Sequence, residues 1–239
     1  AMRWVKNHPG ARRVVLSIAL FAIFSAPIQG LMPYFASDIL QIGPKGLGNL
    51  LSSLGAGAIT GAFLLGFLPS FYPKHHLIPL SLISLGLFMI TYSQAPTAGF
   101  AYVLLFISGI FWIWTMISCN TAMQLLVPDK IRGRAMSILL VANVGMLPIG
   151  HLVAGLVANY IGPRTTMLIS AICLLIIGLI TLVNRVPQID GITRDIPEPK
   201  WRNFYSEIIL ASQYRADALS LDRSMHNAKI KNQKLDPDH

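Results

Sequence analysis

The feature that most constrains the fold is a stretch from Leu77 to Pro128 that contains no Asp, Glu, Lys or Arg. About 20 apolar helical residues span the hydrocarbon core of a bilayer, so this stretch is long enough for two crossings. The polar, turn-forming sequence SQAPTAG at residues 93–99 divides it in the middle. The sequence therefore predicts two membrane-spanning helices joined by a short turn.

Further uncharged runs of the same length lie on both sides of this stretch. Hydrophobic residues make up 54% of the chain and charged residues 12%, whereas a soluble domain carries about 25% charged residues. The runs lack the alternating polarity of barrel strands, so we expect an all-α membrane protein with six transmembrane helices. The predicted spans are residues 14–36, 47–69, 77–93, 99–122, 136–159 and 164–184.

Basic residues are distributed unevenly between the loops. They gather before the first span and in alternate loops, whereas the remaining loops carry only Lys45 and Arg164. Because Lys and Arg are retained on the cytoplasmic side, we expect both termini in the cytoplasm. The net charge of +9 follows this flanking pattern. It forms no basic stripe with interleaved aromatic residues, so a nucleic-acid partner is not expected.

The composition changes abruptly at Arg185. The sequence RVPQIDGITRDIPEPK is charged and rich in Pro, which is typical of a linker. Apolar residues then recur at helical spacing from Trp201 to Ala211. We expect residues 185–239 to form a cytoplasmic tail, partly an amphipathic helix, with a disordered end.

Few strongly polar side chains occur inside the predicted spans, and each is costly at membrane depth and hence a functional candidate. They are Gln29, Asn49, Asn120, Gln124, Asn143 and His151. No carboxylate lies at mid-membrane, which leaves His151 as the candidate for a proton switch. Its structural alternative is donation to the carbonyl that Pro148 frees. Asn143 lies about two helical turns before His151, so both are candidates for one helix face.

Motifs for catalysis and metal binding are absent from the sequence. It contains no P-loop, no G-x-S-x-G, no H-E-x-x-H and no C-x-x-C spacing. We therefore predict that the protein is not an enzyme and has no cofactor or metal. Trp112 and Trp114 are interpreted as packing aromatics, with a lining for a hydrophobic substrate as the alternative for this pair.

A charge cluster interrupts the apolar sequence at residues 124–140, QLLVPDKIRGRAMSILL. Asp129 follows Pro128 and is placed to cap the next helix and to meet its positive end. Arg132 and Arg134 can reach helix carbonyl ends or anionic lipid headgroups, and Gly133 permits close backbone approach. We predict a charged clasp between helix ends on the cytoplasmic side.

The segment NTAMQLLVPDKIRGRAMSILLVANVGMLPIGHLVAGLVANYIG, residues 120–162, resembles the tenth and eleventh helices of major facilitator superfamily transporters. It is most similar to the bacterial enterobactin-exporter-like group, in which N-x-x-x-Q, V-P-D-x-x-R-G-R-x-M-S and P-x-G-x-x-x-A-G recur. The opening AMRWVKNHPGARR resembles the end of the cytoplasmic linker before helix seven, and GLMPYFASDIL resembles the end of that helix. The resemblance extends to about Asn184. It implies a C-terminal half, helices seven to twelve, with residues 1–13 as linker end and 14–184 as the transmembrane domain of a bacterial inner-membrane protein.

This resemblance implies a secondary efflux carrier for a small amphipathic molecule that works by alternating access, with a 3+3 inverted repeat in the half. The implied cytoplasmic gate consists of Asp129, Arg132, Gly133, Arg134, Asn120 and Gln124. Among the polar residues of the spans, His151, Asn143, Gln29 and Asn49 are the candidates for the central cavity. Expected partners are the lipid bilayer, the small-molecule substrate, and a six-helix N-terminal half or a second copy. The alternative is a non-transporting scaffold or truncated remnant whose tail binds a partner.

Overall fold

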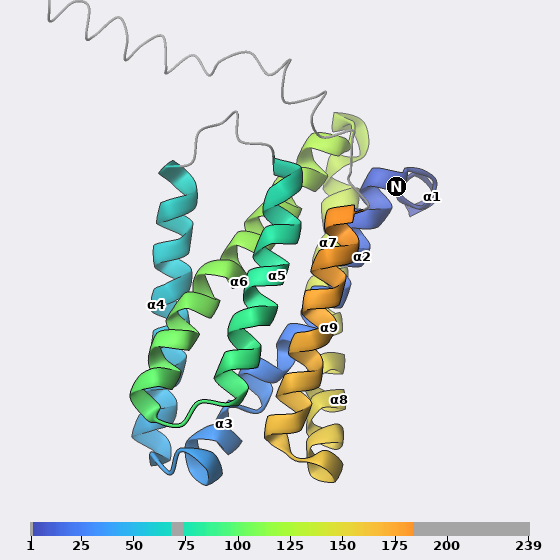
Figure 1. The fold of residues 1–239 in the computed structure, drawn as a ribbon. Coiled ribbons are helices and arrows are strands. Elements are labelled where there is room, and N and C mark those ends of the chain that lie inside the picture. The colour runs from blue at the N-terminus through green and yellow to red at the C-terminus, as the bar shows by residue number, and fades with distance from the viewer. Residues whose placement is uncertain (1, 68–73, 184–239) are drawn as a thin grey trace, which may run out of the picture. The chain divides into compact units, whose positions relative to one another are not determined.

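The computed structural model describes residues 2–67 and 74–183, and every regular element in these residues is helical (Figure 1). Within them, six helical segments are long and apolar enough to cross a membrane. They are Pro9–Ile39, Gly43–Phe67, His76–Ser93, Ala98–Leu126, Asp129–Ile161 and Pro163–Val183. The predicted all-α fold with six spans is thereby confirmed. The predicted tail, residues 185–239, lies outside the described residues.

The helices follow one another with short connections. Their bounds are α1 (Met2–Asn7), α2 (Pro9–Gly30), α3 (Met32–Tyr34), a π-helical turn (Phe35–Ile39), α4 (Gly43–Phe67), α5 (Lys74–Ser93), α6 (Ala98–Leu126), a 3-10 turn (Asp129–Ile131), α7 (Arg132–Val144), α8 (Met146–Ile161) and α9 (Pro163–Val183). The chain divides into two units, Ala1–Arg194 and Asp195–His239. All of these helices belong to the first unit.

The fifth span is interrupted between α7 and α8 at Gly145. Pro148 has no N–H to donate to the carbonyl of Val144, and its ring crowds that carbonyl. The regular helix accordingly ends at Val144, and the Gly145 N–H donates to the Val141 carbonyl at 2.9 Å. Proline chemistry thus divides one membrane span into two helices.

The helix contacts are reciprocal between the two halves of the bundle. The helix α2 packs on α8 and α9, α6 packs on α4 and α5, and α5 packs on α9 (Figure 1). The first helix of each triplet (α2–α4–α5 and α6–α7/α8–α9) therefore contacts the second and third helices of the other triplet. This is the pattern that two three-helix repeats related by a two-fold axis produce.

Glycines allow the closest of these contacts. A Cβ atom added at Gly57 would overlap the Phe106 carbonyl, and one added at Gly109 would overlap the Leu54 carbonyl, so α4 and α6 meet backbone to backbone. Gly57 and Gly61 lie four residues apart in the sequence, a spacing that predicts such a close contact between helices. A glycine also allows the close contact between α2 and α8, because a Cβ atom added at Gly150 would lie 2.6 Å from the Ile23 carbonyl oxygen.

Candidate functional site

The charge cluster of residues 128–134 forms the connection between α6 and α7. Pro128 is extended and starts the 3-10 turn Asp129–Ile131, after which α7 begins at Arg132. The carboxylate of Asp129 pairs with the Arg132 guanidinium at 2.5 Å. Both side chains are exposed, at 84% and 48% respectively, so solvent screening limits the pair to at most about 1 kcal/mol.

The prediction that Asp129 caps the following helix is wrong. The residue that caps α7 is Ile131, whose side chain makes no capping hydrogen bond. The cause is the inserted 3-10 turn, which moves Asp129 a full turn ahead of the helix and places it beside Arg132 instead. Instead of capping α7, the Asp129 carboxylate forms an ion pair with Arg132.

Among the other members of the predicted gate, Gln124, Gly133 and Arg134 are exposed, whereas Asn120 is half-buried. A Cβ atom added at Gly133 would meet nothing within 4 Å. In the described part of the chain, Arg134 makes no ion pair. The expected clasp between helix ends is therefore represented here by one contact, Asp129–Arg132, which lies within a single connection.

Two asparagines from α6 and α7 meet at one methionine. The Asn120 amide donates to the Met116 carbonyl at 2.8 Å, and the Asn143 amide donates to the Met116 sulfur at 3.0 Å. The structure thereby joins a residue predicted for the gate, Asn120, to one predicted for the central cavity, Asn143.

His151 packs against α2. A Cβ atom added at Gly30 would lie 3.0 Å from the imidazole Cδ2 atom. The imidazole makes no hydrogen bond with any described residue, and its Nε2 atom is buried. The expected donation to the carbonyl freed by Pro148 is therefore not formed, because the ring turns toward α2 rather than along its own helix. Asn143 and His151 consequently contact different helices.

Gln29 lies in a cavity of about 260 Å³ where α2, α4 and α6 meet. We call it the Gln29–Trp112 cavity; its lining is Gln29, Leu51, Leu54, Gly55, Ala58, Gly109 and Trp112. The indole of Trp112 is held edge-on to the Phe21 ring with centroids 5.1 Å apart. One amide and one large ring thus share an otherwise apolar space, which suits an amphipathic small molecule. Trp112 lines this cavity, whereas the Trp114 N–H donates to the Gly61 carbonyl at 2.7 Å.

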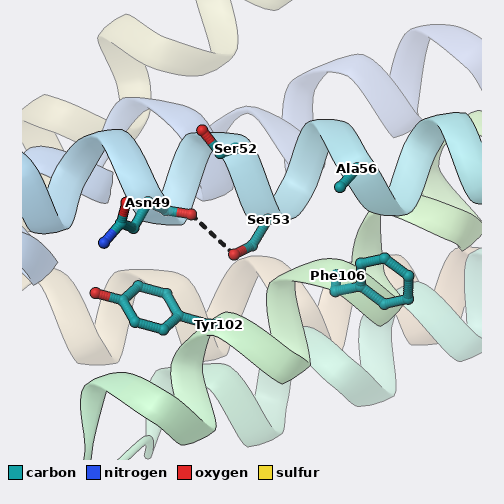
Figure 2. A pocket seen from close by; sticks show the side chains of 6 residues that line it. All are labelled: Asn49, Ser52, Ser53, Ala56, Tyr102 and Phe106. Carbon is teal, nitrogen blue, oxygen red and sulfur yellow. Dashed lines mark hydrogen bonds between the residues drawn. The ribbon is translucent and has the colours of Figure 1, made fainter.

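Asn49 lies in a different pocket, between α4 and α6 (Figure 2). This open groove of about 410 Å³ is lined by Asn49, Ser52, Ser53, Ala56, Tyr102 and Phe106. On α4 its residues fall on the face opposite those that line the Gln29–Trp112 cavity, as a turn of about 100° per residue requires. The four predicted cavity residues are therefore not brought together.

Comparison with known proteins identifies one family to which the chain is similar. A family model described as transmembrane secretion effector matches residues 1–216. The match includes all six spans and continues past Asn184, where the motif resemblance ends. No curated protein and no solved structure matches the chain.

Proposed function

The chain belongs to the transmembrane secretion effector family, a family of major facilitator transporters, and from this premise we propose that it is the C-terminal half of an efflux carrier. As a member, it is a multi-pass membrane protein and a transporter, and its six helices correspond to half of the superfamily fold. In the proposal, it exports a small amphipathic molecule by alternating access across a bacterial inner membrane, with both termini cytoplasmic.

The observation that carries the proposal is the Gln29–Trp112 cavity. Three helices from different parts of the chain supply its wall, and Gln29 is its only side-chain amide. Its volume of about 260 Å³ falls just below the range of about 300–1,000 Å³ that is typical for small-molecule sites. A second six-helix bundle facing this side would complete the wall and enlarge the site.

The exposure of two spans supports a second bundle. Only 22% of the most apolar window of Gly43–Phe67 and 17% of that of Asp129–Ile161 are buried, the lowest shares among the six described spans. Leu51, which lines the cavity, is 48% exposed, and the large apolar side chains of Val141, Leu152 and Leu156 are more than half exposed. These two spans occupy equivalent positions in the two triplets. We propose that the side of these spans next to the Gln29–Trp112 cavity receives the N-terminal half, or a second copy, in the complete carrier.

The Asp129–Arg132 pair is the proposed cytoplasmic gate contact. We expect Asp129→Asn to lower transport by a larger factor than it lowers membrane abundance. An exposed pair contributes at most about 1 kcal/mol, which corresponds to about 4 °C or less in Tm for a domain of this size. Transport of a labelled amphiphile and quantitative immunoblotting of the membranes measure the two effects.

Lys130→Gln is the matched control, because Lys130 is exposed in the same 3-10 turn and forms no ion pair with a described residue. It should change neither quantity. Equal losses of transport and abundance in Asp129→Asn would show that the pair serves folding alone.

Export itself is tested in whole cells. Deletion of the chain should raise the accumulation of amphipathic dyes or siderophores, and production of the chain should restore the low level. We expect the chain to restore the low level only when it is paired with a six-helix N-terminal half or with a second copy of itself. Accumulation that stays unchanged on deletion, with and without such a half, would contradict the proposed efflux and favour the scaffold alternative.

A further inference from the structure

We propose that the groove between α4 and α6 binds an anionic phospholipid by its headgroup. The groove contains Asn49, Ser52 and Tyr102 beside the apolar Ala56 and Phe106, in an open space of about 410 Å³. It lies on a different face of α4 from the Gln29–Trp112 cavity. The lipid is therefore separate from the exported substrate, and its binding does not depend on the proposed transport.

Polar residues continue along this face of α4 to its start. Lys45, Asn49, Ser52 and Ala56 follow one another at spacings of four, three and four residues, which places them on one side of a helix. All four are exposed. A membrane-spanning helix therefore presents an ammonium, an amide and a hydroxyl to its surroundings on one face.

Most of these groups have no partner among the residues that the structure describes. Ser53 is satisfied locally, because its hydroxyl donates to the Asn49 carbonyl at 2.8 Å (Figure 2). The Asn49 amide, the Ser52 hydroxyl and the Tyr102 hydroxyl make no hydrogen bond with a described residue, and Lys45 makes no ion pair with one. Polar groups without partners are costly next to hydrocarbon. A ligand with several hydrogen-bond acceptors would satisfy them together.

The polarity of the groove is graded along its length. In Figure 2 the Asn49 amide and the Tyr102 hydroxyl lie at one end, and Ala56 and Phe106 lie at the other. The polar end is near the starts of α4 and α6, at the end of the bundle away from the α6–α7 connection (Figure 1). Tyrosine is enriched at headgroup level in membranes. The gradient thus fits a headgroup at the interface and an acyl chain beside Phe106.

The positive charge of Lys45 is the reason to expect an anionic headgroup. The Lys45 ammonium is a point charge that suits phosphate, and a lysine side chain near the end of a membrane helix extends toward the headgroups. The acidic group on the neighbouring element is Asp38, in the π-helical turn that packs on α4, and it is exposed and forms no ion pair with Lys45. The positive charge is therefore available to a phosphate.

The test uses the full purified chain in detergent. Native mass spectrometry and thermal unfolding are measured with phosphatidylglycerol, phosphatidylcholine and inorganic phosphate added separately. Phosphatidylglycerol should be retained and should raise Tm, whereas the other two should have little effect. Lys45→Gln should weaken phosphatidylglycerol binding about tenfold, as the loss of one charge-assisted contact predicts, and Asn49→Leu and Tyr102→Phe should weaken it further.

Lys130→Gln is the control, because it removes an exposed lysine at the other end of α6. Each variant should keep the lipid-free Tm of the wild type, because the altered side chains are exposed or half-buried. Equal phosphatidylglycerol binding by Lys45→Gln and Lys130→Gln would overturn the proposal. Equal retention of phosphatidylcholine would also overturn it, as would competition by millimolar phosphate, which would indicate a site for a free anion.

Discussion

Gly57→Leu is expected to abolish the folded six-helix bundle or to lower its Tm by more than about 10 °C. A Cβ atom at this position would overlap the backbone carbonyl of Phe106. Because the obstacle is main chain, no side-chain rotation relieves it, and α4 would have to separate from α6. Overpacking typically costs about 1–3 kcal/mol, and separating one of the two most extensive contacts in the bundle adds to this. Fluorescence-detected size-exclusion chromatography after a heating series measures the loss.

Gly66→Leu is the matched control for this prediction. Gly66 lies on the same helix and is exposed, and a Cβ atom added there would meet nothing within 4 Å. The same substitution in the same helix should therefore leave Tm close to that of the wild type. Similar losses in both variants would mean that the effect reflects helix propensity or membrane insertion rather than the α4–α6 contact.

Gln29→Leu is expected to lower transport between about 5-fold and about 100-fold while the protein stays folded. Leucine fills a similar volume but removes the one amide of the Gln29–Trp112 cavity. The polar part of an amphipathic substrate would then enter an apolar space without a hydrogen-bond partner, which costs about 1–3 kcal/mol. Transport at several substrate concentrations, normalised to membrane abundance, measures the change.

Gln94→Leu is the control for this variant. Gln94 is exposed in the turn between α5 and α6, and its amide donates to the Ser93 hydroxyl at 3.3 Å. It contributes nothing to the cavity, so transport should be unchanged. A Gln29→Leu protein that transports at the wild-type rate would remove the cavity from the substrate path.

The helices could be predicted from the sequence because charge is excluded from a bilayer core. The uncharged stretch from Leu77 to Pro128 gave two spans, and the structure contains them as α5 and α6. The small residues at Gly57 and Gly61 likewise predicted a close helix contact, because few side chains allow backbones to meet. The hydropathy pattern did not predict that the fifth span is divided at Gly145, although the presence of Pro148 indicates such a break.

The site was less predictable, since it depends on how each helix is rotated. Gln29 and Asn49 are both polar residues in apolar helices, yet they open into different pockets. A single polar residue in an apolar helix does not show which neighbouring helices it will lie between, because that depends on how the helices pack. The position of Trp112 in the cavity wall could not be predicted either, because the sequence does not distinguish a tryptophan that packs in the core from one that lines a cavity. The error at Asp129 has another cause, the unforeseen 3-10 turn.

Uptake of a fluorescent amphiphile into energised inverted membrane vesicles tests the central claim most directly. Vesicles are prepared from cells that lack the chain, that contain it, and that contain its Gln29→Leu variant, each with and without a co-produced six-helix N-terminal half. The proposed export predicts energy-dependent uptake that requires the wild-type chain and falls in the variant. Uptake that is the same in all vesicles, whichever half is present, would contradict it.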